Sequence, residues 1–182
     1  MSLTPAQLLT LKSDMLGASN ATLAPLIAAN DTSLIAAYYA GQHPSTRVWR
    51  EDCTPAQVHA VIVWANLTPV DNADGTALYT NRTQICLIKQ ANLQMMLTPG
   101  GGAFLPAAVQ TYRDGMQDAL TGIPSAVGGT KQGAGFNAVE NAMRRLGSRL
   151  EVLFSVVQGN ASKTDVYGYL VTPNEIADAL VA

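Results

Sequence analysis

One helix-start signal occurs three times in this chain and constrains its fold more than any other sequence feature. The signal is Thr followed directly by Pro, with Gln or Glu three residues after the Thr, and it stands at residues 4–7, 54–57 and 172–175. The Thr hydroxyl can accept from a free backbone N–H, and the Gln or Glu side chain can bond back to the N–H of the cap. Proline is tolerated between them because its missing N–H would have no partner there. The sequence therefore predicts helices that begin at residues 5, 55 and 173.

Hydrophobic spacing extends this signal to most of the chain. The strongest pattern covers residues 138–157, where Val139, Leu146, Leu150 and Leu153 recur at helical intervals and predict one central buried stripe. In total, helices are expected at residues 5–16, 23–30, 32–41, 55–65, 76–97, 104–120 and 138–157, and from 173 to the C-terminus.

A few segments favour a conformation other than a helix. Residues 46–50 are typical of an extended connector, and the β-prone Val and Tyr residues of 165–171 predict a short strand. Residues 159–164 are polar and predict a loop. The expected fold class is therefore mainly α: a single-domain helical bundle with a short β segment and a helix at the C-terminus.

No repeat or change in composition divides the chain, and 182 residues suit one domain. We expect one helical domain over 1–182, with short N-terminal helices in 1–45, core helices in 54–157 and a C-terminal tail in 159–182. Turns are predicted at 71–75 and 99–102. Residues 121–137 form a predicted loop with five glycines, and a loop of that length in a compact domain is usually functional.

The composition limits the kind of surface this protein has. Charged residues are 13% of the chain, against roughly 25% in average soluble domains. Such a surface loses water at little cost and suits a protein that contacts other proteins. An Ala-rich sequence alone would also explain the low proportion of charged residues. The net charge of −2 gives no basic field for nucleic acid. No apolar run reaches the roughly 18 residues of a membrane span, and the N-terminus does not resemble a signal peptide.

The chain offers no recognisable set of catalytic, cofactor-binding or metal-binding residues, and we expect it not to be an enzyme. The two histidines, His43 and His59, have no partner at metal-ligand spacing. Cys53 and Cys86 are expected to be small buried residues, with Cys53 against Val58, and a disulfide between them stays open. The glycines of 128–133 stand in the wrong order for a phosphate-binding loop.

Basic residues give one further indication. Arg144, Arg145 and Arg149 lie on one predicted helix, and Arg82 and Lys89 on another, where they could face DNA or acidic groups of a partner. The favoured alternative is an amphipathic helix with local ion pairs, such as Arg144 with Glu140.

Several stretches along nearly the whole chain resemble a family of small virion proteins of tailed bacteriophages. They are the Thr-Pro-Ala-Gln-Leu opening with Leu11 and Lys12, Val48-Trp49-Arg50, Trp64 with Thr68-Pro69 and Asp71, Asn81-Arg82, residues 89–94 with Met96-Leu97, Arg113-Asp114-Gly115, residues 123–126, Arg145 with Arg149-Leu150-Glu151, and the C-terminal tail.

The resemblance implies a head-to-tail connector, or adaptor, in the neck of the virion, made in the cytoplasm of a bacterial host. Such adaptors form homo-oligomeric rings, commonly dodecamers, and bind the portal protein and tail or neck proteins, with non-specific contact to DNA in the channel. We expect partners to bind the glycine loop and the tail. The candidate residues are Gly128, Gly129, Lys131, Gly133, Gly135, Tyr167, Tyr169 and Val171.

Three alternatives stay open. The first is a tail terminator or other neck protein. The second, from another class, is a soluble accessory or regulatory binding module. The third and least favoured is an enzyme whose site has no recognisable motif.

Overall fold

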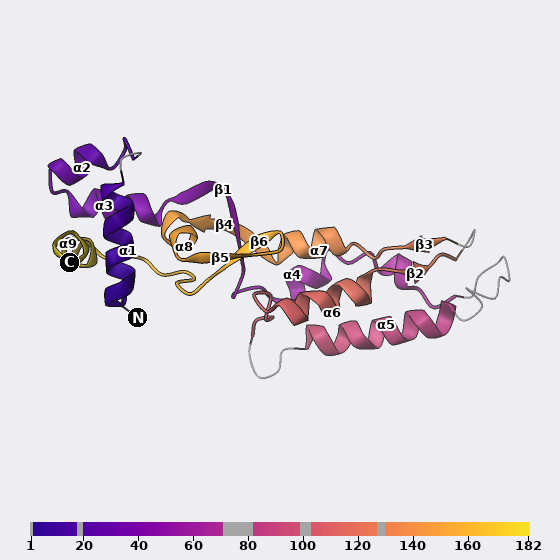
Figure 1. Cartoon of the computed structure of the whole chain (residues 1–182). Helices are drawn as coiled ribbons and strands as arrows, with labels where there is room; N and C mark the ends of the chain where they lie inside the picture. Colours follow the sequence, from indigo (N-terminus) through magenta and orange to yellow (C-terminus); the bar gives the residue numbers. More distant parts are fainter. Residues whose placement is uncertain (1, 18–19, 71–81, 99–102, 127–129) are drawn as a thin grey trace. The chain divides into compact units, whose positions relative to one another are not determined.

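A computed structural model describes residues 2–17, 20–70, 82–98, 103–126 and 130–182 (Figure 1). Over these residues the chain combines helices with a four-stranded mixed sheet and a two-stranded sheet. The fold is therefore mixed α/β, and the prediction of a mainly α helical bundle is wrong. The chain divides into two compact units: unit 1 comprises residues 1–48 and 146–182, and unit 2 comprises residues 49–145.

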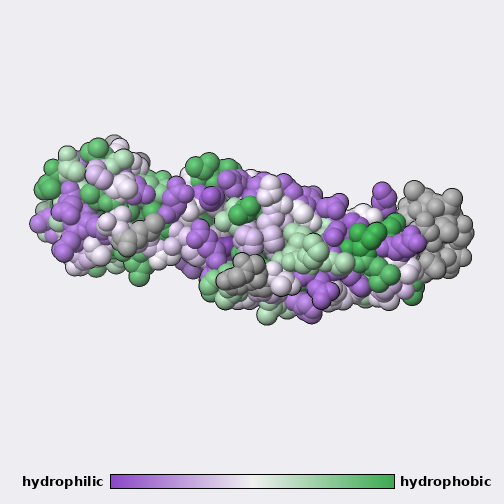
Figure 2. Space-filling model, turned by 90° about the horizontal axis from the view of Figure 1, so that it is seen from below, coloured by the Kyte–Doolittle hydropathy of each residue, from purple (hydrophilic) through white to green (hydrophobic). Residues whose placement is uncertain are grey.

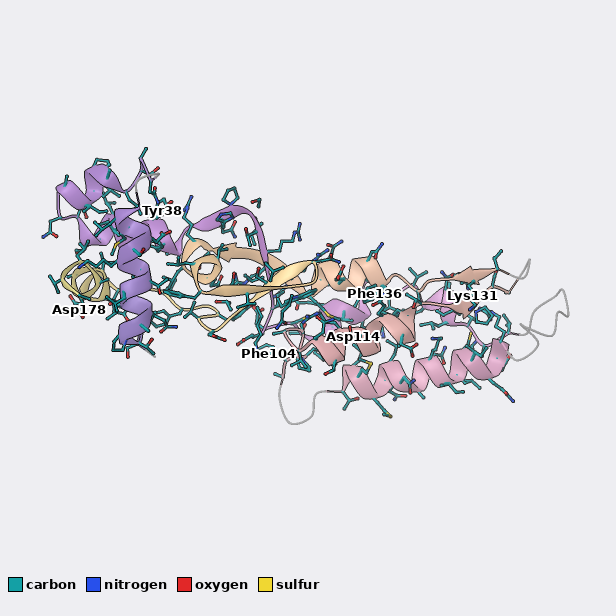
Figure 3. The ribbon with its side chains drawn as sticks, viewed as in Figure 1. Tyr38, Phe104, Asp114, Lys131, Phe136 and Asp178 are labelled. Carbon is teal, nitrogen blue, oxygen red and sulfur yellow. The ribbon has the colours of Figure 1, made fainter. Side chains whose placement is uncertain are left out.

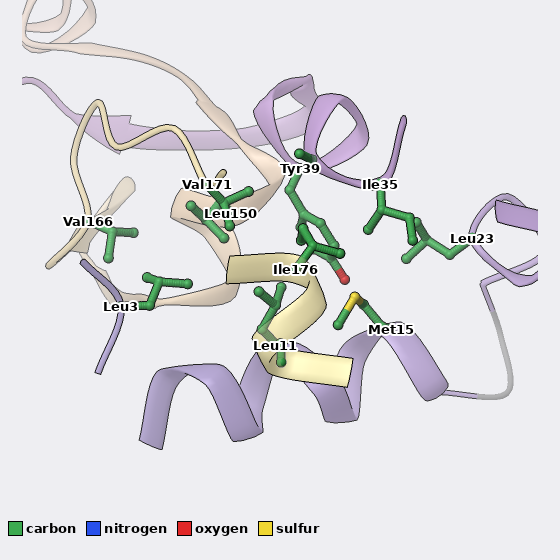
Figure 4. Close-up of a cluster of buried hydrophobic side chains, with 12 residues drawn as sticks. Leu3, Leu11, Met15, Leu23, Ile35, Tyr39, Leu150, Val166, Val171 and Ile176 are labelled. Atoms are coloured by element: carbon green, nitrogen blue, oxygen red, sulfur yellow. The ribbon is translucent and has the colours of Figure 1, made fainter. Parts of the chain in front are cut away.

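The helices of unit 1 come from both ends of the chain. They are α1 (Pro5–Leu16), α2 (Ala24–Ala28), α3 (Thr32–Ala40), α8 (Arg149–Leu153) and α9 (Pro173–Val181). Leu11 and Met15 of α1, Ile35 of α3, Leu150 of α8 and Ile176 of α9 are all buried in one cluster (Figure 4). This cluster, rather than a central long helix, forms the core of unit 1.

The four-stranded sheet has the order β4 (Arg144–Ser148), β1 (Gln42–Trp49), β6 (Ala161–Thr164), β5 (Ser155–Gln158). β1 runs parallel to β6 with Val48 opposite Ser162. β5 and β6 form an antiparallel hairpin in which Gln158 pairs with Ala161. The two-residue turn begins at Gly159, whose φ of +67° lies in the left-handed region that glycine adopts without strain.

The long helix predicted over residues 138–157 is wrong. The chain there forms α7 (Phe136–Ala142), β4, α8 and β5 in succession. Ser148 starts a new helix with its own capping box, because its Oγ accepts from the N–H of Glu151 at 3.1 Å. A Cβ on Gly147 would lie 2.8 Å from Cγ1 of Val48, so β4 approaches β1 at a position that only glycine fits. Val139 and Leu150 are both buried, but in different units.

The predicted loop and strand of the C-terminal tail are also wrong. Residues 161–164 form β6, whereas the predicted strand 165–171 is a turn followed by irregular chain. The N–H of Tyr169 donates to the carbonyl of Val166 at 3.0 Å, which closes the turn. The Gly159-Asn160 turn, which follows two β-prone valines and Gln158, was the hairpin signal.

Unit 2 contains α4 (Pro55–His59), the 3-10 helix η1 (Trp64–Leu67), α5 (Arg82–Leu97), α6 (Gln110–Leu120) and α7. It also holds the antiparallel pair β2 (Ile123–Pro124) and β3 (Lys131–Gln132), which lies inside the predicted glycine loop. Its core is formed by buried apolar residues: Cys53, Val58, Leu67, Cys86, Leu93, Leu105, Met116, Leu120, Ile123 and Val139.

The three predicted helix starts are confirmed. Thr4, Thr54 and Thr172 each form a complete capping box with the Gln or Glu three residues later. A buried apolar residue also precedes each cap, as in a hydrophobic staple: Leu3, Cys53 and Val171. The start signal therefore encodes both the hydrogen bonds of the first turn and the packing that fixes how the chain enters it.

Two helices of unit 2 are shorter than predicted. α4 ends at His59 because the β-branched residues Val61, Ile62 and Val63 disfavour a helix, and the N–H of Val63 donates to the carbonyl of Ala134 at 3.0 Å. α6 begins at Gln110 rather than near 104, because Pro106 disfavours a helical conformation at Leu105. The first residues of the predicted helix 76–97, with the turns at 71–75 and 99–102, lie outside the described residues.

Candidate functional site

The structure places the predicted partner-binding residues in both units. Gly128 and Gly129 lie outside the described residues. Lys131 is exposed on β3 (Figure 3), and Gly135 is the N-cap of α7 with φ +89°. The carbonyl of Gly133 accepts a hydrogen bond from Nδ2 of Asn66 at 2.8 Å. The glycine segment is thus partly a β-hairpin that is bonded to the chain around η1.

The tail residues lie in unit 1. Val171 is buried in its core, and Tyr167 is half-buried. The Tyr169 hydroxyl donates to the carboxylate of Glu175, and burial together with this bond raises the pKa of Tyr169 to about 12. These tail side chains have partners inside unit 1, so only their exposed edges are available to a partner protein.

Glu175 connects the two ends of the chain. Its Oε1 accepts from the backbone N–H of Leu3 at 3.0 Å, and its Oε2 accepts from the N–H of Thr172 at 2.9 Å. Burial raises the pKa of the Glu175 carboxyl, but the bonds from Tyr169, Thr172 and Leu3 outweigh this effect and hold the pKa below its ordinary value. The ionised carboxylate therefore stabilises the packing of α9 against the N-terminal segment.

Arg82 has a structural role inside unit 2. Its side chain is 1% exposed, and its guanidinium donates to the carbonyls of Thr68, of Val70 at 2.8 Å, of Pro124 at 2.6 Å and of Asn66 at 3.2 Å. A buried guanidinium with carbonyl acceptors has most of its donors satisfied. Arg82 therefore fastens η1 and β2 to α5 and does not face DNA or a partner.

The other arginines are also held by local contacts. Arg113 is buried, with its guanidinium carbon 3.9 Å from the centroid of the Trp49 ring, and burial lowers its pKa. Arg144 forms the expected pair with Glu140 at 3.6 Å. Arg149 lies over the Tyr38 ring at 4.3 Å, and its Nη1 donates to the Tyr38 carbonyl at 3.0 Å. These contacts favour the interpretation of local pairing over a nucleic-acid surface.

The described residues contain no group of three His, Cys, Asp or Glu side chains placed to hold a metal ion. Cys53 and Cys86 are both buried free thiols, so the disulfide that the sequence left open is not formed. Burial raises the pKa of both thiols, which makes them poor nucleophiles.

α5 carries apolar residues on two opposite faces. Cys86 and Leu93 are fully buried on the inner face. Leu87, Ile88 and Met95 are 51%, 61% and 73% exposed on the outer face. At about 100° per residue these three and Ala91 fall in one sector, which we call the outer stripe of α5. Figure 2 shows hydrophobic patches on the side where α5 lies in Figure 1.

A second exposed apolar surface belongs to unit 1. β5 stands at the end of the sheet order, and its Val156 and Val157 are 69% and 76% exposed. Natural edge strands are usually protected by Lys, Pro or a bulge, and β5 has neither Lys nor Pro. We call Val156 and Val157 with the backbone of β5 the β5 edge.

Neither the outer stripe of α5 nor the β5 edge was predicted from the sequence. Leu87, Ile88, Ala91 and Met95 do follow helical spacing, but so do the inner residues of α5, and a single periodicity does not tell which stripe is covered. Val156 and Val157 fall within the predicted helix 138–157, which does not form. Two valines next to a Gly-Asn turn were the signal for an edge strand.

The chain matches no family model, no curated protein and no solved structure in comparisons with known proteins. Within the described part of the chain, no helix is both long enough and apolar enough to cross a membrane.

Proposed function

We propose that this chain is a structural protein of a tailed-bacteriophage virion, a head-to-tail connector or adaptor that forms a ring between the portal and the tail. The observation that carries the proposal is the outer stripe of α5. A helix that already buries one apolar face and leaves a second one exposed is typical of a surface that another protein covers. Virion localisation and the partners are part of the same proposal.

The charge distribution of α5 supports contact with protein. Its two charged residues are Arg82 and Lys89, and both donate to backbone carbonyls, Lys89 to that of Asp118. The outer stripe has no formal charge among its residues, so covering it costs little desolvation. The low proportion of charged residues in the whole chain agrees with extensive burial between subunits.

Two different apolar surfaces on one chain favour a ring. The outer stripe of α5 belongs to unit 2 and the β5 edge belongs to unit 1. If one surface of a subunit binds the other surface of its neighbour, the contact is head-to-tail, and repeated head-to-tail contacts close into a ring or extend as a filament. The resemblance to phage virion proteins favours the ring and supplies the portal and tail as partners.

A tail terminator or other neck protein uses the same surfaces and remains the nearest alternative. An accessory or regulatory module of another class would also expose an apolar surface, but it would be absent from the particle. Mass spectrometry of purified virions separates these classes, because a connector is present in a fixed number of copies per particle. Cryo-microscopy of the chain mixed with portal protein then tests the ring; a strictly monomeric chain that is absent from virions contradicts the proposal.

A further inference from the structure

We propose that unit 2 also contains a binding site for a neutral sugar ring. The site is a pocket of about 490 Å³ between the segment that leads into η1 and the C-terminal half of α5. This volume lies in the range of small-molecule sites. The lining residues are His59, Trp64, Gln90, Gln94, Leu97 and Thr98.

One wall of the pocket is aromatic and firmly positioned. The indole Nε1 of Trp64 donates to the carbonyl of His59 at 3.1 Å, and the two rings lie 4.6 Å apart with a tilt of 38°. Trp64 is only half-buried, and Leu67 in the same 3-10 helix is fully buried. An indole fixed at one end by a hydrogen bond presents apolar surface to which the C–H groups of a sugar ring can pack.

The other wall supplies hydrogen-bonding groups with unused capacity. Nε2 of Gln90 donates to the carbonyl of Leu67 at 2.8 Å, which orients the amide and leaves its Oε1 as an acceptor. The Thr98 hydroxyl donates to the carbonyl of Gln94 at 2.7 Å and can still accept. Within the described residues the side-chain amide of Gln94 makes no hydrogen bond, so it offers both a donor and an acceptor.

The absence of charge on the pocket wall selects the ligand. The six lining residues include no Lys, Arg, Asp or Glu. A phosphate or carboxylate would therefore lose its hydration without gaining a permanent counter-ion from these residues, of which His59 alone can take up a proton. The acceptors on Gln90 and Thr98 require donors from the ligand. Sugar hydroxyls are donors and acceptors at once, whereas a proline-rich segment would bring an apolar ring but no N–H for these acceptors.

Tryptophan fluorescence reports directly on this site. The chain has two tryptophans, and Trp49 is 2% exposed while Trp64 lines the pocket. We expect a saturable change in emission on titration of the full chain with at least one of glucose, galactose, mannose or N-acetylglucosamine. Trp64→Phe, which keeps Trp49, should remove the change. Gln94→Ala should weaken binding about tenfold, the effect of losing one to two hydrogen bonds.

Gln84→Ala is the matched control, because Gln84 is exposed on the same helix and does not line the pocket. It should bind as the unaltered chain does. The proposal is overturned if no neutral sugar gives a saturable change, or if Gln94→Ala binds sugar as tightly as Gln84→Ala. It is also overturned if glucuronate or a triproline peptide saturates the signal while the neutral sugars do not. A sugar response in Trp64→Phe equal to that of the unaltered chain would likewise exclude this pocket.

Discussion

Ser148 and Glu151 bond to each other's backbone. The Ser148 Oγ accepts from the N–H of Glu151 at 3.1 Å, and Oε2 of Glu151 accepts from the N–H of Ser148 at 2.8 Å. The second carboxylate oxygen, Oε1, accepts from the N–H of Gly168 at 2.6 Å. This reciprocal pair starts α8 and attaches the turn after β6 to it. A separate helix therefore begins here, in place of the continuous helix predicted over residues 138–157.

Removing this cap should destabilise unit 1. Ser148→Ala leaves the N–H of Glu151 without its acceptor, and we expect a loss of about 0.5–2 kcal/mol in the free energy of unfolding. Urea denaturation followed by circular dichroism measures the loss. Ser13→Ala, at an exposed position within α1, should change stability much less. Equal stability of the two variants would show that the cap does not hold α8.

The core of unit 1 depends on Leu150. Its side chain is fully buried among residues of α1, α3 and α9. Leu150→Ala should therefore cost about 2–5 kcal/mol through lost burial and a residual cavity. Leu34→Ala provides the comparison, since Leu34 is 53% exposed. A loss below about 1 kcal/mol for Leu150→Ala would contradict the placement of α8 in this core.

Arg82 should be among the least replaceable residues of unit 2. Arg82→Met keeps the length of the side chain but removes the guanidinium donor from the carbonyls of Val70 and Pro124. The carbonyl of Asn66 still accepts from Nε2 of Gln132, and that of Thr68 from the N–H of Val70. Pro124 is buried, and leaving its carbonyl unsatisfied costs about 1–3 kcal/mol, so we expect a loss of at least about 1 kcal/mol in the free energy of unfolding. Arg47→Met, at an exposed position of β1, is the control. Thermal unfolding that is equally affected by both changes would show that these bonds do not stabilise the unit.

The hydrogen bonds to Glu175 predict a dependence on pH. Because its pKa is lower in the folded chain than in the unfolded chain, its contribution is fully present above the unfolded value of about 4.3 and is lost as pH falls through the folded value. Glu175→Gln can still form a capping box but does not ionise, so its stability should fall less between neutral and acid pH. Urea denaturation of both chains across this pH range measures the difference. Free energies of unfolding that change in parallel with pH would contradict the lowered pKa of Glu175.

The short local signals of this sequence predicted structure better than the long ones. The start codes at Thr4, Thr54 and Thr172 depend on three or four residues whose hydrogen bonds are all within one turn, and they are confirmed. The 138–157 helix depended on the spacing of apolar residues, which reports only that they face inward. Once Ser148 starts a new helix, Val139 and Leu150 can face two different cores with the same spacing.

The candidate surfaces were less predictable for the same reason. Whether Ile88 or Cys86 faces the core of unit 2 depends on which helices pack on α5, and that follows from contacts far apart in sequence. The predicted partner residues Tyr169 and Val171 instead have partners in unit 1 that sequence spacing does not reveal. The role of Lys131, exposed on β3, stays a prediction.

A ring of this chain requires that the outer stripe of α5 is covered by another copy. Light scattering during gel filtration measures the mass of the assembly for the unaltered chain and for two variants, Ile88→Glu and Leu34→Glu. Leu34 is an exposed leucine outside the stripe. We expect a mass several times the 19.2 kDa of one chain for the unaltered chain and for Leu34→Glu, and a monomer for Ile88→Glu. A monomer in all three, or an assembly that Ile88→Glu leaves intact, would contradict this expectation.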